Sequence, residues 1–131
     1  MMNTLAQEGA KYNVKINALA PTAGTRMTEG LIDEKAFALL TPETVTPAVL
    51  YLVSEDAPTR TILAAGAGSF AVAKIVETEG MWLPEAEQTP EGIAAHWEQI
   101  SEGGERALQA GFEQSIKMVG QAAKGLGLDM G

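Results

Sequence analysis

The pattern of apolar and polar residues predicts the element order helix, strand, helix, strand, helix and helix. Residues 14–20 alternate between apolar and polar side chains before the run becomes fully apolar, which is typical of a strand that enters a buried sheet. Pro21 ends this strand because proline has no N–H to donate to a ladder. Residues 61–65 form a second short apolar run. The order indicates an α/β fold with two strands of a parallel sheet, helices, and a helical C-terminal tail.

Two Thr-Pro-Glu sequences mark predicted helix starts, at Thr41 and at Thr89. In each, the threonine can cap the helix, the proline suits its first turn, and the glutamate complements its positive end. Pro47 requires the first of these helices either to begin its regular part at Thr46 or to be kinked. A further helix is predicted over Met2–Glu8. Apolar residues follow at helical spacing: Val45, Val49, Leu52 and Val53; then Ile93, Trp97 and Ile100, which we expect to face inward; then Leu108, Phe112, Ile116, Val119 and Ala123.

Composition excludes several kinds of partner. The 131 residues have a net charge of −8 and only nine Lys and Arg, so the clustered phosphate contacts of a nucleic-acid-binding protein are not expected. No apolar stretch reaches the roughly 20 residues that a membrane-spanning helix needs. The absence of cysteine removes disulfides and thiolate metal sites and fits a reducing compartment. We therefore expect a cytoplasmic protein that binds neither nucleic acid nor membrane.

One glycine motif allows a nucleotide-binding hypothesis. The run from Gly66 through Gly68 to Ala71 has the form G-x-G-x-x-A, in which glycines let the backbone approach a pyrophosphate at a helix start. The same run is also what a plain turn at a strand end looks like. We keep a small nucleotide-binding domain that uses Gly66 and Gly68 as an alternative and favour the turn.

Other candidate groups do not form a catalytic pattern. His96 and Ser101 are five residues apart, so a helix does not bring them to one face as a nucleophile and its base. Glu98, Glu102 and Glu105 lie at i, i+4 and i+7, which is more typical of a solvated helix face than of a metal site. We assign no catalytic residue and no metal ligand.

Four segments follow one another along the sequence in the order and at the spacing found in one known family. Residues 14–21 are similar to a strand of the pattern v-N-a-x-a-P-G, and residues 1–13 to the long helix that precedes it. Residues 41–55 are similar to a helix ending in L-x-S-d, and residues 61–63 to a last strand. Together they resemble the short-chain dehydrogenase/reductase family over residues 1 to about 70. The resemblance implies the C-terminal part of a Rossmann-like sheet.

The loop after the first strand narrows the resemblance. Residues 21–28 resemble the sequence P-x-A-G-[ST]-R-M-T of 3-hydroxyacyl-CoA dehydrogenase-type domains in multifunctional β-oxidation enzymes, and residues 66–70 and 89–97 resemble the same subgroup more loosely. This implies two segments. Residues 1–70 would be the C-terminal part of the dinucleotide-fold dehydrogenase domain. Residues 71–131 would be a helical tail on the substrate side that also packs subunits together.

The resemblance also implies which residues meet a cofactor. In the family, the loop after this strand contacts the nicotinamide amide through backbone and a threonine hydroxyl. Carried over, the cofactor-binding positions are Pro21, Thr22, Thr25 and Thr28. Thr22 stands where the family has glycine, and Arg26 stands at the usual threonine position, so the hydroxyl that acts stays open. The implied cofactor is NAD or NADP in the parent protein, and we expect none to bind tightly to this chain.

The family's catalytic residues are not found in these 131 residues. The family uses Tyr-x-x-x-Lys with a serine, but Tyr12 is followed by Ile16 and Tyr51 by Glu55. We therefore expect a fragment of an NAD(P)-dependent oxidoreductase acting on 3-hydroxyacyl-CoA-like substrates that is not catalytic alone. A non-catalytic protein-interaction module is the alternative. In either case we expect the chain to pair with itself as a homo-oligomer or with the remainder of its parent.

Overall fold

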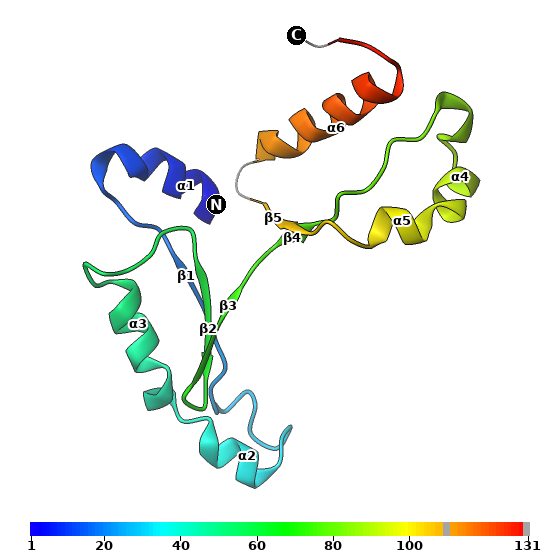
Figure 1. Cartoon of the computed structure of the whole chain (residues 1–131). Coiled ribbons are helices and arrows are strands. Elements are labelled where there is room, and N and C mark those ends of the chain that lie inside the picture. Colours follow the sequence, from blue (N-terminus) through cyan, green and yellow to red (C-terminus); the bar gives the residue numbers. More distant parts are fainter. Residues whose placement is uncertain (109–110, 130–131) are drawn as a thin grey trace. The chain divides into compact units, whose positions relative to one another are not determined.

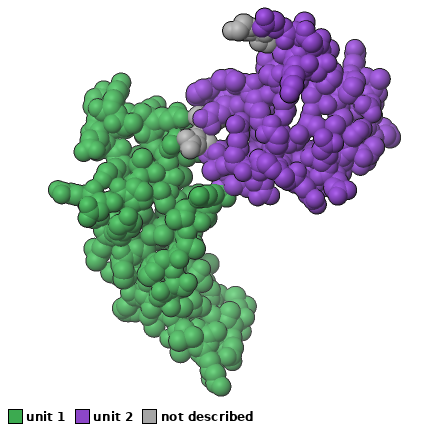
Figure 2. Space-filling model, viewed as in Figure 1, with its two compact units in different colours: residues 1–74 green, residues 75–131 purple. Residues whose placement is uncertain are grey.

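The structure is a computed structural model that describes residues 1–108 and 111–129. It forms two compact units, Met1–Lys74 and Ile75–Gly131 (Figure 2). The first contains α1 (Met2–Gly9), the 3-10 turn η1 (Ala10–Tyr12), β1 (Ala18–Pro21), α2 (Glu34–Leu39), η2 (Pro42–Thr44), α3 (Thr46–Leu52), β2 (Ile62–Gly66) and β3 (Ser69–Ala73) (Figure 1). The second contains β4 (Val76–Glu77), η3 (Glu85–Glu87), α4 (Pro90–Ala95), α5 (Trp97–Ser101), β5 (Arg106–Ala107) and α6 (Gly111–Gly125).

The first unit is built on a mixed three-stranded sheet in the order β1-β2-β3. β1 and β2 are parallel, from Ala18 opposite Ile62 to Pro21 opposite Ala65. This confirms the two parallel strands and the α/β class. The antiparallel β3 was not predicted from the sequence, and it spans residue 70, the expected boundary between the two segments.

β1 begins later than the predicted strand at residues 14–20, because the residues before it bind a loop instead of a strand. The Asn17 side chain donates to the Pro58 carbonyl at 2.7 Å and accepts the Thr61 N–H at 3.1 Å. The Ile16 carbonyl accepts the Arg60 N–H at 2.8 Å. These bonds join the segments that lead into β1 and β2, and so fix the register of two strands that are distant in sequence.

The glycine run between β2 and β3 is a hairpin turn. Ala67 has φ of 51° and Gly68 has φ of 76°, and Gly66 pairs with Ser69 on the opposite strand. Positive φ at both central residues is the signature of a type I′ turn, whose twist matches that of the flanking strands. The chain therefore continues as a strand and does not begin the helix that a pyrophosphate site requires. This contradicts the nucleotide-binding alternative at Gly66 and Gly68.

α3 covers the parallel strands and forms the core of the first unit with them. Val45, Ala48 and Ala65 are buried together, and Leu19, Ala23 and Leu63 pack against them. The helix begins at Thr46 after the turn η2, which is one of the two arrangements that Pro47 allowed. Val49 and Val53, although at helical spacing with Val45, lie exposed.

The second unit contains helices and a short antiparallel pair, β4 with β5, which the sequence did not predict. The Thr89 side chain accepts the Gly92 N–H at 3.0 Å, which confirms the predicted cap. The expected single helix is interrupted at His96, where φ is −110° and ψ is 15°. α5 restarts after this break. Trp97 is 60% exposed and Ile93 is 46% exposed, so the expected inward orientation of these two residues is wrong.

α6 presents its predicted apolar stripe outward over most of its length. Phe112, Ile116 and Val119 are exposed, Ala123 is buried, and Leu108 lies before the helix. Another side of the helix, carrying Lys117 and Gln121, contacts the segment after β4. Among the described residues, no helix has both the length and the apolar character needed to cross a bilayer.

Candidate functional site

The candidate site is the loop that follows β1, at the carboxyl end of the parallel strand pair. Ligands of α/β sheets bind outside this end of the strands. The Thr22 N–H donates to the Ala65 carbonyl at 2.8 Å, so the contact with β2 continues one residue beyond β1. A Cβ added to Gly66 would lie 2.8 Å from the Thr22 carbonyl oxygen. The loop therefore leaves the sheet in close backbone contact with β2, which only glycine permits at residue 66.

A second anchor fixes the loop at Gly24. Its N–H donates to the Leu40 carbonyl, just after α2. A Cβ on Gly24 would lie 3.1 Å from the Leu40 carbonyl oxygen and 3.1 Å from the Phe37 ring. The small residue lets α2 hold the loop closely.

The third anchor is a turn closed by Thr28. Its hydroxyl accepts the Thr25 N–H at 2.9 Å and donates to the Thr25 carbonyl at 3.1 Å. The backbone N–H of Thr28 also donates to the Thr25 carbonyl, at 3.0 Å. A threonine that bonds nearby backbone in this way stabilises a turn.

These contacts separate the four predicted cofactor residues by role. Pro21, Thr22 and Thr25 are exposed, whereas Thr28 is partly buried and its hydroxyl bonds within the loop. Within residues 1–108 and 111–129, the Thr22 and Thr25 hydroxyls make no hydrogen bond. A carboxamide needs a donor and an acceptor, and an exposed hydroxyl with neighbouring carbonyls can provide both.

Neither tyrosine of the chain forms an acid–base pair with a lysine four positions on. Tyr12 lies in η1 with the Lys11 amine 5.2 Å from its ring centre. The Tyr51 hydroxyl donates to the Asp56 carbonyl at 3.4 Å. These local contacts do not assemble a proton relay around the loop.

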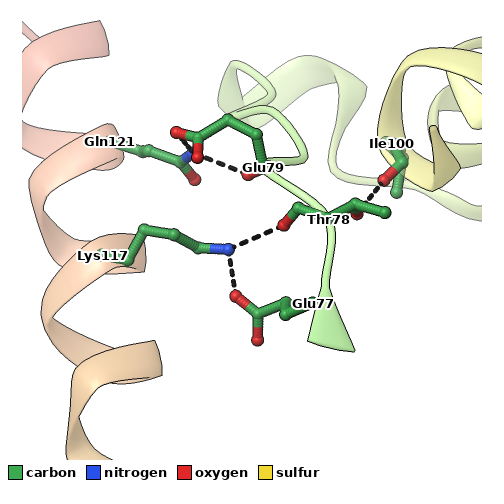
Figure 3. Close-up of polar contacts among 6 residues, drawn as sticks. All are labelled: Glu77, Thr78, Glu79, Ile100, Lys117 and Gln121. Atoms are coloured by element: carbon green, nitrogen blue, oxygen red, sulfur yellow. Dashed lines mark hydrogen bonds and ion pairs between the residues drawn. The ribbon is translucent and has the colours of Figure 1, made fainter. Parts of the chain in front are cut away.

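The second unit contains a polar cluster that the sequence did not suggest. The Lys117 amine on α6 pairs with the Glu77 carboxylate and donates to the Thr78 carbonyl at 3.0 Å (Figure 3). One turn later, Gln121 donates to the Glu79 carbonyl at 3.0 Å. Forty residues separate Lys117 from Glu77, and spacing along a chain gives no signal for such a pair.

The Lys117 hydrogen bond holds the pKa of Glu77 below its ordinary value of 4.5. The positive charge of Lys117, the nearby Gln114 amide and the charge of Arg106 act in the same direction, and burial opposes them. The Lys117 and Glu77 side chains are only 11% and 14% exposed. The carboxylate is therefore ionised at neutral pH and tied to α6.

Comparison with known proteins finds dehydrogenases among the relatives of this chain. No family model matches it. It is 37% identical over 103 residues to a Mycobacterium tuberculosis protein named as a short-chain type dehydrogenase/reductase, covering 78% of this chain and 36% of that protein. It is 36% identical over 105 residues to the peroxisomal hydratase-dehydrogenase-epimerase of Saccharomyces cerevisiae, covering 78% of this chain and 12% of that enzyme.

A solved structure matches almost the whole chain. Full-length peroxisomal multifunctional enzyme type 2 from Drosophila melanogaster superposes with a TM-score of 0.76 at 26% sequence identity. The match covers 94% of this chain and 23% of that one. The chain thus spans about a third or less of the proteins it matches.

The relatives correct one expectation. Several are named as peroxisomal multifunctional enzymes or peroxisomal hydratase-dehydrogenase-epimerases, which contradicts the cytoplasmic location expected from the sequence. That expectation used the absence of cysteine, which bears on redox chemistry and does not distinguish one compartment without disulfides from another.

Proposed function

Because the chain belongs to the short-chain dehydrogenase/reductase family, we propose that it supplies the nicotinamide-side loop of an oxidoreductase that acts on 3-hydroxyacyl-CoA-like substrates. Its relatives are named dehydrogenases, reductases and hydratase-dehydrogenase-epimerases, which supports an oxidoreductase segment. The substrate class rests on the loop at residues 21–28 and on the multifunctional enzymes among the relatives.

The geometry of the loop after β1 is the observation that carries this proposal. Three anchors, at Ala65, Leu40 and Thr28, tie the loop to β2, to the residue after α2 and to itself. A preorganised loop binds a ligand without the cost of ordering it afterwards. It presents the hydroxyls of Thr22 and Thr25 to solvent at the end of the sheet where ligands bind.

These residues fit one part of NAD or NADP, the nicotinamide carboxamide. The bound cofactor would accept or supply the hydride. In the proposed arrangement the Thr22 or Thr25 hydroxyl donates to the carboxamide oxygen, and a carbonyl of residues 21–22 accepts from its nitrogen. Thr28 is a positioning residue, since its hydroxyl is engaged with the backbone of Thr25.

The chain alone is proposed to lack turnover, because neither Tyr12 nor Tyr51 begins a Tyr-x-x-x-Lys sequence. The purified 131-residue chain can be incubated with a 3-hydroxyacyl-CoA and NAD or NADP while reduced nicotinamide is monitored. Calorimetry should show NAD binding no tighter than about 1 mM, roughly −4 kcal/mol. Turnover that copurifies with the chain through successive columns would contradict the proposal.

We also propose that the chain assembles with a second copy or with the rest of a dehydrogenase. β1 and β3 are the edge strands of their sheet, and all five residues of β3 are exposed. Unpaired edges and apolar surface such as Phe70 and Val72 favour association. Sedimentation at micromolar concentration should show a species larger than 13.8 kDa. A monodisperse monomer would contradict self-association.

A further inference from the structure

We propose that α6 is a contact surface between two copies of this chain, and that the two helices pack antiparallel around a two-fold axis near Val119. This interface is distinct from the edge strands of the sheet, because every residue that carries it lies in the second unit. It therefore does not rest on the oxidoreductase role of the loop after β1.

α6 has an apolar face that the rest of its unit leaves uncovered. Lys117 and Gln121 tie one side of the helix to the segment after β4. The opposite side carries large apolar side chains at helical spacing, each more than half exposed: Phe112, Ile116, Val119 and Leu126. Leu126 lies just beyond the helix and continues it, since its N–H donates to the Ala122 carbonyl at 2.9 Å. An apolar surface of this kind marks a contact with another molecule.

The shape of this face fits a second helix. A groove of about 400 Å³ lies on it, lined by Ser115, Ile116, Val119 and Gly120. These residues form two rows in which neighbours are four positions apart, 115 with 119 and 116 with 120. When helices pack, the groove between two such rows receives a ridge of side chains from the other helix.

Two sets of residues give the same register for a second copy of α6. Around a two-fold axis, residue i meets residue j and residue j meets residue i, so the axis passes through the midpoint of each pair. The midpoint of Glu113 and Lys124 lies between residues 118 and 119, and that of Phe112 and Leu126 lies at residue 119. One antiparallel arrangement therefore joins opposite charges and apolar side chains at the same time, twice each.

The two charges are available for this contact. Within the described part of the chain, neither Glu113 nor Lys124 makes an ion pair or a side-chain hydrogen bond. They are 11 residues apart, about three turns, and so lie on the same side of α6. A parallel pair would set Glu113 level with Glu113 and Lys124 level with Lys124, and neither attraction would form. A second copy is the partner that this pattern selects, because one helix carries both halves of each contact.

Single thiols test the register directly, because the chain has no cysteine of its own. In the proposed arrangement the two copies of residue 119 lie within about 2 Å along the axis of helices packed about 8–10 Å apart. The full chain with Val119→Cys should therefore form a disulfide-linked dimer under mild oxidation at micromolar concentration. The two copies of residue 112 lie about 20 Å apart, so Phe112→Cys should not cross-link.

Charge reversal tests the pairing. In the Val119→Cys chain, Glu113→Lys or Lys124→Glu alone should slow cross-linking by about fivefold, because two attractive contacts become repulsive. Both changes together should restore the rate to within about twofold. The exchange places each charge at the unfavourable end of the helix, so this recovery cannot come from a more stable helix. Glu102→Lys is the matched control: Glu102 is exposed and outside α6, and its reversal changes the net charge as Glu113→Lys does.

Fast cross-linking of Val119→Cys, none of Phe112→Cys and recovery in the double reversal support the proposal. A Val119→Cys chain that stays unlinked, or equal cross-linking at the two positions, would overturn it. So would a double reversal that keeps the circular dichroism of the unsubstituted chain and does not recover. Ile116→Gln leaves every charge in place and should slow cross-linking of Val119→Cys by about fivefold, so it decides the matter if the double reversal loses helix. An unchanged rate in Ile116→Gln would overturn the proposal.

Discussion

The Thr28 hydroxyl closes the loop after β1 onto Thr25, accepting its N–H at 2.9 Å and donating to its carbonyl at 3.1 Å. The two threonines therefore do different things although both were predicted to meet the cofactor. One sets the conformation of the turn, and the other stays exposed on it.

Thr28→Val should loosen this turn. Valine keeps the shape of threonine but neither accepts nor donates, so the first unit should lose about 1 kcal/mol of stability. Amide exchange at Thr25 should accelerate, since its N–H loses its acceptor. Thr25→Val is the matched control and should change stability by less than about 0.5 kcal/mol. If the Thr25 amide exchanged equally fast in Thr28→Val and in the unsubstituted chain, the assigned role of Thr28 would be contradicted.

Ala67→Asn should stabilise the β2–β3 hairpin by about 0.5–1 kcal/mol. Ala67 has φ of 51°, which is unfavourable for alanine and tolerated by asparagine. Ala71→Asn within β3 is the control, and it should be neutral or destabilising because asparagine is depleted in strands. The free energy of unfolding of each variant is measured by chemical denaturation and, separately, by hydrogen exchange in residues 62–73. Loss of stability in Ala67→Asn would show that the turn is not of type I′.

Two glycines of α6 should respond oppositely to alanine. A Cβ at Gly125 would lie 2.2 Å from the Trp82 ring, so Gly125→Ala should destabilise the second unit by about 1–3 kcal/mol. A Cβ at Gly120 meets nothing within 4 Å, so Gly120→Ala should stabilise the helix by about 0.5–1 kcal/mol. Both tryptophans lie in this unit, and their emission during urea unfolding reports it. Matching effects of the two variants would contradict the packing of Trp82 on α6.

Glu77→Gln should lower the urea midpoint of the second unit at neutral pH, because the carboxylate loses its charge and its pairing with Lys117. The pKa of Glu77 is lowered in the folded chain. Its contribution to stability is therefore fully present above the ordinary value of 4.5 and is lost as pH falls through the lowered value. The difference in urea midpoint between the unsubstituted chain and Glu77→Gln should therefore shrink as pH falls. Glu102 is exposed, and Glu102→Gln is the control. If the midpoint difference caused by Glu77→Gln grew at low pH, the pairing of Glu77 with Lys117 would be contradicted.

The sequence predicted those parts of the fold whose signals are local. The Thr89 cap and the two parallel strands each follow from a few adjacent residues. The same Thr-Pro-Glu signal at Thr41 gave no side-chain cap, and the start of α3 at Thr46 is one of two arrangements that Pro47 left open. β3 was missed because the run from Gly66 to Ala71 also fits a turn before a helix, and Ala67 is an unusual residue for a hairpin turn. The break at His96 was missed because no proline or glycine marks it.

The candidate site was predicted in part for the same reason. The sequence motif at residues 21–28 identified the loop. That Thr28 closes the turn while Thr25 stays exposed depends on backbone conformation, which the sequence does not show. The Glu77–Lys117 pair depends on how α6 packs against the chain after β4, 40 residues away. Tertiary contacts of this kind leave no periodic pattern.

A chimera can show whether the loop after β1 is a nicotinamide-side segment. The homologous segment of the Mycobacterium tuberculosis relative is replaced by this chain, and the KM for the nicotinamide cofactor is measured with and without the paired change Thr22→Val and Thr25→Val. The chimera should transfer hydride. Removal of both exposed hydroxyls should raise its KM for the cofactor by about fivefold, which corresponds to the loss of one hydrogen bond. A folded chimera that transfers no hydride, or one whose KM for the cofactor is unchanged when both hydroxyls are removed, would contradict the assignment of this loop.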